Sequence, residues 1–556
     1  MRSVVVTAVL VAVLSVPAVN AATPAAAPCT LDPAKIDAVF SDFGPTTPGC
    51  ALGIYSDGQV LYAKGYGMAD LDLNVPITPR TMFDIGSTSK QFTAAAIVML
   101  ADEGKLKLTD DIRKYLPEIP DYGHLITIDN LLHHTSGLRD YDGLLYLAGH
   151  YFEDFTDDDD ALAIIARQKA LNFTPGTQWS YSNTGFFLQA IIVKRVTGES
   201  LADFDKTNFF QPLGMTETNF RTDHTAILKD RATGYDPKDG GGFKIDLSNW
   251  DQIGDGGVNT NVLELAKWDA DFYDGKVGGR QLIDQMQTRA TLDNGKPTNY
   301  GRGLFLDTYR GLTRVQHGGS WAGYRAMLMR FPEQKLSIGM TCNVSNADTM
   351  GRAEKVADVV LAKAFTQPRA STDAKGAPAP YTGPKLAPET VAGAYVSDAA
   401  QSALRLVADK GVLVLKYGPL SLPMDQTGPR QFTTKAFPVT ATFDPDDRTL
   451  VLVIGDDAQP PYTRVAPWSP SPADIDALAG RYHSPELGTD WTIRVADGVA
   501  YVKGRAVGEA KLDPIAKDIW TSDMGYFAVR RGADGHITGY DLSASRMLRI
   551  GFNRVN

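Results

Sequence analysis

The chain has 556 residues, 43% of them hydrophobic, and a formal net charge of −10 at pH 7. This length is too great for one hydrophobic core, so it predicts several domains, and the apolar content is sufficient to bury them. The acidic charge and the lack of Lys- or Arg-rich runs argue against a nucleic-acid partner or an anionic membrane surface.

The N-terminus predicts a signal peptide over residues 1–22. A basic start precedes a mostly apolar stretch over residues 4–19, and Ala21 and Ala22 supply the small residues of a cleavage site. The apolar stretch is shorter than a membrane span, and no cysteine stands where a lipobox would need one. We therefore expect a mature protein that is periplasmic or secreted and has no membrane anchor.

Three cysteines occur, Cys29, Cys50 and Cys342. Cys29 and Cys50 lie close together near the expected mature N-terminus, so a disulfide between them suits an exported protein; the alternative is two unpaired small apolar residues. Cys342 ends the strand-like run 336–341, and we expect it to be a buried free thiol. No Cys or His spacing resembles a zinc site, and we predict neither a metal nor another cofactor.

Four segments follow the signal peptide. Residues 23–366 alternate strand-like and helix-like stretches, which predicts a mixed α and β domain. Residues 367–386 are rich in Pro, Ala, Gly and Thr, a composition typical of a linker. Residues 387–467 and 468–556 are short β-type alternations whose opening sequences echo each other, so we predict two small antiparallel β-barrels.

Within the first of these segments, the pattern predicts elements in a definite order. Strands are expected at residues 51–55 and 60–66, and helices at residues 91–103, 160–170 and 185–197. Two sequence motifs lie directly before the helices expected at residues 91–103 and 185–197.

Ser87 and Lys90 stand three residues apart, where an extended run becomes a helix. This spacing places a hydroxyl and an amine on one helical face. A serine hydroxyl at its ordinary pKa is a poor nucleophile, and a neighbouring base activates it. The alternative interpretation is an amphipathic helix with a capping serine.

Two later motifs carry residue types that suit the same chemistry. Tyr181 and Asn183 come directly before the helix expected at residues 185–197, although a loop tyrosine packed on a helix would give the same pattern. Residues 317–320, His-Gly-Gly-Ser, lie between two strand-like runs, and the alternative there is a Gly-rich hairpin turn with an incidental histidine.

In this order, the three motifs resemble those of the penicillin-binding protein and class C β-lactamase family of serine hydrolases. The resemblance covers about residues 35 to 365 and extends to segments at 131–138, 212–215 and 256–260. It implies an α+β fold, in which a β-lactamase/transpeptidase-like domain has an antiparallel sheet flanked by helices and an all-helical subdomain. A catalytic domain followed by two barrels also resembles D-stereospecific aminopeptidases, in which a barrel loop helps to shape the active-site mouth.

The resemblance implies a role for each motif residue. Ser87 would attack the carbonyl and form an acyl-enzyme, and Lys90 would accept the Ser87 proton. Tyr181 would act as general base, its pKa depressed by Lys90. Asn183 would bind the substrate amide, and the backbone N–H groups of Ser87 and Ser320 would form an oxyanion hole.

The residues beside Ser320 bear on the substrate. His317 stands where β-lactam-processing relatives have a lysine, and Gly318 lacks the hydroxyl that follows it there. A histidine is neutral over much of the physiological pH range, which weakens both penicillin hydrolysis and recognition of a substrate carboxylate. With Gly319, the His-Gly-Gly segment resembles D-aminopeptidases, D-amino-acid amidases, esterases and enzymes that cut linearised cyclic peptides such as microcystins.

The expected activity is that of an exported serine hydrolase that cleaves amide bonds in small or unusual peptides, including D-residue-containing or linearised cyclic ones. A carboxylesterase with the same residues is one alternative, because hydrolysis of an ester depends less on protonation of the leaving group than hydrolysis of an amide does. A catalytically idle protein that captures a ligand with its barrels is another. The expected partner is a small peptide or ester; the sequence predicts neither stereochemistry nor oligomeric state.

Three further features have structural interpretations. His133 and His134 have no third ligand at metal spacing and are expected to support the site from beneath. The four acidic residues at 157–160 are expected to cap a helix. The Gly-rich segment around Ser320 resembles a nucleophile elbow, but a strand follows it where an elbow needs a helix.

Overall fold

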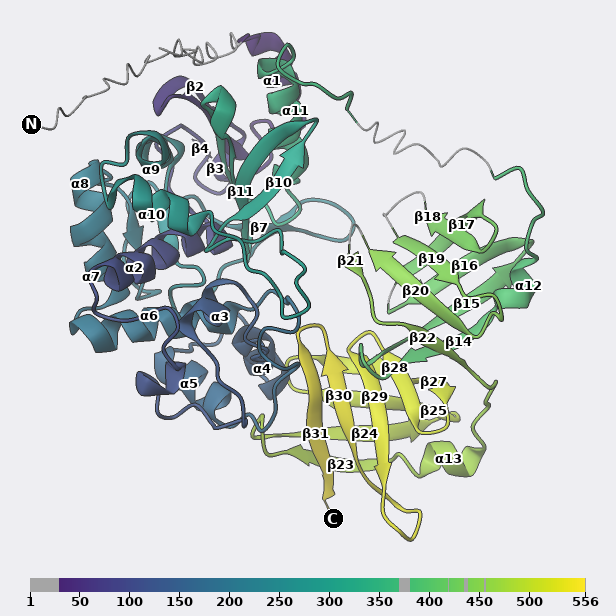
Figure 1. Cartoon of the computed structure of the whole chain (residues 1–556). Helices are drawn as coiled ribbons and strands as arrows, with labels where there is room; N and C mark the ends of the chain where they lie inside the picture. Colours follow the sequence, from purple (N-terminus) through teal and green to yellow (C-terminus); the bar gives the residue numbers. More distant parts are fainter. Residues whose placement is uncertain (1–29, 370–380, 419, 435–438, 455–456, 556) are drawn as a thin grey trace, which may run out of the picture.

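The computed structural model of the protein describes residues 30–369, 381–418, 420–434, 439–454 and 457–555 (Figure 1). The expected signal peptide, Cys29 and the middle of the expected linker lie outside these residues. The described chain forms a mixed α and β part followed by two β-barrels, which confirms the expected fold class.

An antiparallel sheet in the order β10-β11-β12-β13-β1-β2 forms the centre of the first part. Its strands are Cys50–Ser56 (β1), Gln59–Tyr66 (β2), Phe305–Tyr309 (β10), Leu312–Trp321 (β11), Tyr324–Phe331 (β12) and Leu336–Cys342 (β13). Helices α1 (Pro33–Ala38) and α11 (Thr349–Val360) cover one face, and α9 (Val262–Asp274) covers the other. Because both faces are covered, β1 and β13 are buried along nearly their whole length.

Within the described ranges, seven further helices gather on the α9 side of the sheet. They are α2 (Lys90–Asp102), α3 (Ile128–Leu132), α4 (Tyr141–Ala148), α5 (Asp158–Ala166), α6 (Asn183–Thr197), α7 (Leu201–Asp205) and α10 (Gly279–Met286). Helices α2 and α6 pack together and are buried almost all round, as their apolar sequences require. A capping box between Asp157 and Asp160 starts α5, so the acidic run caps a helix as predicted.

Short elements join these layers. They are β3 (Met68–Asp70), β4 (Val75–Pro76), β5 (Phe83–Asp84), η1 (Gly86–Ser89), η2 (Ile112–Lys114), η3 (Lys206–Phe210), α8 (Gln211–Leu213), β6 (Asn219–Phe220), β7 (Tyr235–Pro237), β8 (Phe243–Ile245), β9 (Val258–Thr260) and η4 (Pro332–Gln334). Strand β9 pairs with both β5 and β6, which fixes the chain just before η1. Among the described residues, no helix is long and apolar enough to span a bilayer.

Two antiparallel barrels follow. The first contains α12 (Pro388–Val391), β14 (Gly393–Ser397), β15 (Ser402–Asp409), β16 (Val412–Tyr417), β17 (Leu420–Gly428), β18 (Gln431–Thr434), β19 (Val439–Phe443), β20 (Thr449–Ile454), β21 (Asp457–Ala458) and β22 (Tyr462–Val465). The second contains α13 (Pro472–Asp476), β23 (Gly480–Ser484), β24 (Thr489–Ala496), β25 (Val499–Gly504), β26 (Gly508–Lys511), β27 (Asp513–Ala516), β28 (Ile519–Ser522), β29 (Gly525–Arg531), β30 (Ile537–Ala544) and β31 (Met547–Val555). Pairing of β19 with β20 closes the first barrel, whereas β26 and β27 are the two ends of the second sheet.

The two barrels repeat one local arrangement. In each, a tyrosine of the first strand, Tyr395 or Tyr482, donates its hydroxyl hydrogen to the carbonyl four residues earlier, at 2.8 and 2.6 Å. In each, an arginine of the last strand in the ring, Arg464 or Arg554, donates to backbone carbonyls of the same turn. These equivalent contacts match the internal repeat seen in the sequence.

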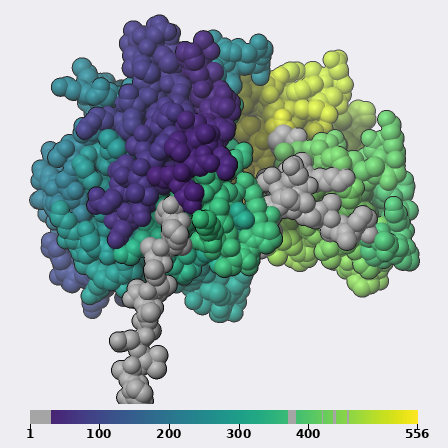
Figure 2. All heavy atoms as spheres, turned by 90° about the horizontal axis from the view of Figure 1, so that it is seen from above, coloured from purple at the N-terminus to yellow at the C-terminus, as the bar shows by residue number. Residues whose placement is uncertain are grey.

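The second barrel packs against the helical part of the molecule, and both barrels lie on the same side of it (Figures 1 and 2). Arg139 and Glu486 form an ion pair of 2.5 Å across this interface, with side chains 1% and 7% exposed. Glu486 also accepts from the Lys169 backbone at 2.9 Å, and Trp491 donates to the Leu147 carbonyl at 3.2 Å. A continuous apolar cluster and a buried ion pair therefore join the two parts.

A disulfide joins Cys50, the first residue of β1, to Cys342, the last residue of β13. The two residues face each other in the antiparallel pair, with Cα atoms 4.0 Å apart. The prediction of a Cys29–Cys50 disulfide and a free Cys342 is therefore wrong. Strand pairing brings together cysteines that are 292 residues apart, and closeness in sequence says nothing about such a pairing.

We expect replacement of both Cys50 and Cys342 by alanine to lower the free energy of unfolding by about 2–4 kcal/mol, because the bridge restricts the unfolded chain. Urea unfolding of this double variant, compared with a Cys29→Ala variant that keeps the bridge, measures the difference. A Cys29→Ala variant that is as unstable as the double variant, or a non-reduced peptide map that joins Cys29 to Cys50, would contradict the pairing.

Candidate active site

Ser87 and Lys90 lie at the junction between strand β5 and helix α2. Ser87 belongs to the turn η1 and Lys90 is the first residue of α2. Gly86 enters this turn at a φ of 48°, in the left-handed region that glycine adopts without strain. The turn brings Lys90 Nζ to 3.0 Å from Ser87 Oγ. Lys90 is fully buried, whereas Ser87 is partly exposed.

The Lys90 amine has two further neighbours. It donates to Asn183 Oδ1 at 2.8 Å and to the Asp255 backbone oxygen at 2.6 Å. Burial lowers the pKa of Lys90 to about 8, although the Asp255 and Asp142 carboxylates oppose the shift. A neutral amine has two N–H donors, and the two carbonyl oxygens can only accept hydrogen bonds. The lone pair of neutral Lys90 therefore faces Ser87 Oγ.

The Tyr181 ring lies beside this pair. Its centre is 5.0 Å from Lys90 Nζ, and the His134 ring packs against it at 4.3 Å. Burial raises the pKa of Tyr181, and this effect outweighs the lowering by the neighbouring Ser87 hydroxyl. The predicted depression of the Tyr181 pKa by Lys90 is therefore wrong. In the buried site the loss of hydration dominates, and Lys90 itself loses its charge more readily.

Asn183 begins helix α6 and connects Lys90 to two carboxylates. Its backbone N–H donates to Asp140 Oδ1 at 2.6 Å, and its Nδ2 donates to Asp142 Oδ2 at 2.7 Å. Its Oδ1 accepts the bond from Lys90. The Nδ2 group has a second hydrogen and the residue lines the cavity described below, so Asn183 retains a donor for a substrate carbonyl.

His317 is a neutral, buried residue. Its Nδ1 lies 2.6 Å from the Gly318 carbonyl oxygen, and its Nε2 lies 3.0 Å from the Tyr300 hydroxyl. Because a carbonyl oxygen only accepts, Nδ1 carries the proton and Nε2 accepts from Tyr300. Burial, followed by the charge of Lys90, lowers the pKa of His317 to about 3. His317 therefore offers no cation to a substrate carboxylate near neutral pH.

Strand β11 packs closely against η1. Thr88 Oγ1 donates to the His317 carbonyl oxygen at 3.2 Å. Gly319 contacts Ile85 so closely that any Cβ there would overlap the Ile85 carbonyl oxygen. The Ser320 backbone nitrogen lies next to the start of η1. Because β11 turns directly into another strand, β12, Ser320 does not lie on a nucleophile elbow.

A cavity of about 1030 Å³ is lined by every predicted site residue except Lys90, which lies beneath it. Phe152, Trp250 and Trp321 form one wall, and their ring centres are 5.0 to 5.8 Å apart. We call these three residues the aromatic wall. The cavity is large enough for several amino-acid residues, and the wall suits a large apolar side chain.

Comparison with known proteins places the chain in a family. The Beta-lactamase family model matches residues 36–362. The chain belongs to the β-lactamase family. A D-aminopeptidase from Cereibacter sphaeroides is 30% identical over 483 residues, which cover 85% of this chain and 87% of that protein. A D-aminopeptidase from Gluconobacter oxydans is 28% identical over 494 residues, with the same shares covered.

A solved structure shares the fold of this β-lactamase-family chain. The penicillin-binding protein homologue from Pyrococcus abyssi is 23% identical and aligns with a TM-score of 0.57, covering 78% of this chain and 100% of that chain. Alignments of 494 residues are longer than the matched family region, so the likeness to D-aminopeptidases extends into the barrels. The protein is a serine hydrolase of the peptidase or amidase type.

Four charged residues that act on Lys90 were not predicted from the sequence: Asp140, Asp142, Asp255 and Arg546. Asp140 and Asp142 follow the family-like segment 131–138, and Asp255 directly precedes the segment at 256–260. Their closeness to these segments could have identified the three aspartates as site residues. Arg546 lies in the turn between β30 and β31 of the second barrel and lines the cavity. Nothing in its sequence surroundings indicates this placement.

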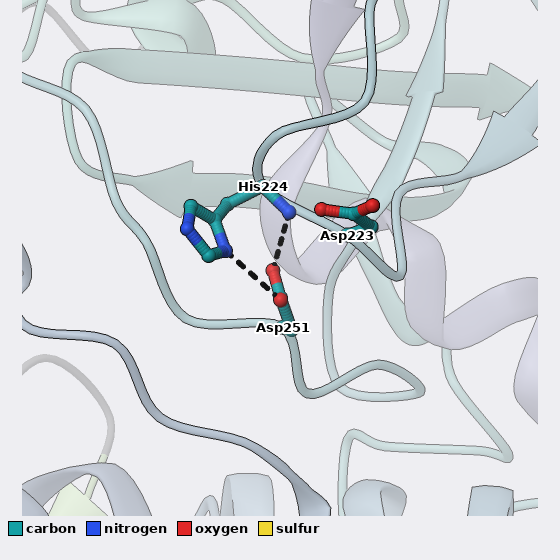
Figure 3. A group of neighbouring side chains, drawn as sticks. All are labelled: Asp223, His224 and Asp251. Atoms are coloured by element: carbon teal, nitrogen blue, oxygen red, sulfur yellow. Dashed lines mark hydrogen bonds and ion pairs between the residues drawn. The ribbon is translucent and has the colours of Figure 1, made fainter.

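One group of possible metal ligands occurs in the part of the chain that the structure describes: Asp223, His224 and Asp251 (Figure 3). Asp251 accepts from the His224 backbone at 2.7 Å and lies 3.0 Å from its Nδ1. Asp223 accepts from the Thr225 backbone at 2.8 Å, and Figure 3 marks no hydrogen bond or ion pair between its carboxylate and the other two residues. The hydrogen bonds between His224 and Asp251 join the two loops that carry these residues, so the group has a structural role that needs no metal.

We expect Gly319→Ala to lower kcat/KM by about 100-fold, because the new Cβ must push β11 away from η1 and misplace the site. Gly318→Ala is the matched control. Its Cβ would lie 3.1 Å from the flexible end of Met327 and at an ordinary contact distance of 3.6 Å from the Ala326 carbonyl oxygen, so its effect should be much smaller. Hydrolysis of an accepted amino-acid p-nitroanilide measures both variants, and circular dichroism checks their folding. Equal losses of kcat/KM in the two variants would contradict the close packing of β11 against η1 at Gly319.

Proposed function

We propose that this β-lactamase-family protein is an exported aminopeptidase-type amidase that cleaves short peptides containing D-residues through an acyl-enzyme on Ser87. One observation carries the proposal. Two carbonyl oxygens hold the buried Lys90 amine so that its lone pair, once the amine is neutral, faces Ser87 Oγ at 3.0 Å. A serine hydroxyl oriented toward a buried base is the arrangement that nucleophilic acyl transfer requires.

In the proposed acylation step, neutral Lys90 takes the Ser87 hydroxyl proton while Ser87 Oγ attacks the substrate carbonyl carbon. The negative charge that forms on the carbonyl oxygen is bound by the backbone N–H groups of Ser87 and Ser320. The Ser320 nitrogen lies next to Gly86, the residue before Ser87. Breaking the amide bond then requires a proton on the leaving nitrogen. Lys90, now an ammonium, holds that proton.

Tyr181 completes the proton path in this proposal. Because burial raises its pKa, it keeps its phenolic proton at neutral pH and acts as a donor and relay. We assign it the transfer of a proton from Lys90 to the leaving amine, by way of the Ser87 region. In deacylation the same residues transfer the proton in the opposite direction. The water that attacks the acyl-enzyme passes a proton to neutral Lys90 by way of Tyr181, which gives up its own phenolic proton as it takes the one from water. Lys90 then returns the proton to Ser87 Oγ as the acyl bond breaks, which regenerates Ser87.

The cavity supports a peptide substrate. Its volume of about 1030 Å³ exceeds the needs of a single amino-acid amide, and the aromatic wall provides apolar contact for a large side chain. Neutral His317 supplies no cation at the position where β-lactam-processing relatives have a lysine, so a substrate carboxylate has no charged partner at this position. The likeness to proteins named D-aminopeptidase supports a free amino terminus and a D-residue at the cleaved bond.

Export is supported by two independent features. The first 22 residues have the composition of a signal peptide. The Cys50–Cys342 disulfide suits an oxidising compartment such as the periplasm or the extracellular space.

A panel of p-nitroanilides tests the substrate class. It contains D- and L-phenylalanine, D- and L-alanine, and the N-acetylated form of each, together with matched short-chain esters. We expect the highest kcat/KM for the free D-phenylalanine substrate, and no hydrolysis by a Ser87→Ala variant. Hydrolysis of the esters alone would contradict the peptidase proposal. A preference for the acetylated compounds would contradict the aminopeptidase proposal.

The labelling rate of Ser87 by a fluorophosphonate should rise with pH through about 8, because the neutral form of Lys90 is the base. This probe avoids the titration of a substrate amine. The Asp255 carboxylate raises the pKa of Lys90, so an Asp255→Asn variant should move the rise to lower pH. A rate that does not change with pH across this range, or a rise that Asp255→Asn moves upward, would contradict the role of Lys90.

A further inference from the structure

We propose that Arg546 of the second barrel is a positioning residue for the active site, which it reaches through Asp140 and Asn183. The inference rests on the proposed function, because it concerns the orientation of Lys90 toward Ser87. It makes the catalytic centre a composite of the β-lactamase-family part and the second barrel. Four residues form the path: Arg546, Asp140, Asn183 and Lys90.

The first contact joins the barrel to a buried carboxylate. Arg546 Nη2 lies 2.8 Å from Asp140 Oδ2, and the Asp140 side chain is 1% exposed. Burial and the nearby Asp142 carboxylate raise the pKa of Asp140 well above its usual range, and the Arg546 guanidinium opposes this shift. A buried carboxylate without a cationic partner would take up a proton or turn away. Arg546 therefore stabilises both the charge and the orientation of Asp140.

The second contact joins Asp140 to helix α6. The first N–H groups of a helix need acceptors from outside the helix, and the N-cap residue Ser182 makes no side-chain cap. Asp140 Oδ1 accepts the Asn183 N–H at 2.6 Å and fills this role from another segment. A carboxylate at this end also complements the helix dipole. The position of the first residue of α6 thus depends on Asp140.

The third contact reaches the proposed base. Asn183 Oδ1 is one of the two carbonyl oxygens that accept from Lys90 Nζ, at 2.8 Å, and thereby set the direction of the amine. Arg546 also contacts the site directly, since its guanidinium lies 5.5 Å from the centre of the Tyr181 ring. One arginine of the barrel therefore contacts both Asp140, which holds Asn183, and the Tyr181 ring.

The turn that carries Arg546 is held independently of the arginine side chain. Asn172 brackets it by donating to the Arg546 carbonyl oxygen at 2.7 Å and accepting from the Leu548 N–H at 2.8 Å. Met547 packs against Gly143 of helix α4. Removing the Arg546 side chain should therefore leave the barrel in place and change only the path to Lys90.

The matched control is Arg505, another arginine of the second barrel at the same interface. Its side chain is 63% exposed and pairs with Asp154 at 3.2 Å, outside the path to Asn183. Arg546→Ala, Arg546→Lys and Arg505→Ala are compared with the wild-type chain. The assays are steady-state hydrolysis of the best D-amino-acid p-nitroanilide and the rate of fluorophosphonate labelling of Ser87.

We expect Arg546→Ala to lower both kcat and the labelling rate by about 10- to 100-fold, with KM changed by less than about threefold. Arg546→Lys should restore part of the loss. Millimolar guanidinium should partly restore Arg546→Ala, an effect that a general loss of packing would not show. Arg505→Ala should retain wild-type values.

The proposal is overturned if Arg546→Ala keeps the wild-type kcat and labelling rate, or if Arg505→Ala loses as much. It is also overturned if neither lysine nor guanidinium restores activity. If the wild-type chain labels with the fluorophosphonate but hydrolyses none of the amides, the proposed function fails, while the labelling rates of the variants still decide the role of Arg546. A wild-type chain that does not label at all overturns both.

Discussion

Burial of the Lys90 amine is the constraint on which the rest of the site depends. A charged amine out of water must be surrounded by acceptors or lose its proton, and here both effects operate. Two carbonyl oxygens and the Ser87 hydroxyl occupy its three hydrogen-bonding directions, and burial lowers its pKa to about 8. The same arrangement that makes the burial tolerable also directs the amine at Ser87.

Each partner of Lys90 comes from a different part of the chain, so the fold must hold several segments rigidly. Asn183 is fixed at the start of α6, and Asp255 lies just before β9, the strand that also pairs with β5. Strand β11 reaches η1 only because Gly319 has no side chain. The central sheet behind them is tied by the Cys50–Cys342 disulfide. Small changes in any of these contacts would move the atoms that must meet within hydrogen-bond distance.

The second barrel extends this network beyond the β-lactamase-family part. Its buried Glu486 pairs with Arg139, and its Arg546 pairs with the next residue, Asp140. Two adjacent residues before helix α4 are thus held by two separate turns of the barrel, the one between β23 and β24 and the one between β30 and β31. The proposed function and the proposed role of Arg546 together explain why a hydrolase of this type would carry an additional domain in close contact with its helical part.

The sequence by itself determined the elements and the chemistry that are local in the chain. The acidic cap of α5, the helices α2 and α6, the two repeated barrels and the Ser87 to Lys90 turn all follow from neighbouring residues. The tertiary structure alone decided the rest: the disulfide partner of Cys50, the raised pKa of Tyr181, and the contact of Arg546 with Asp140. Burial and long-range pairing control these properties, and neither is a function of sequence spacing.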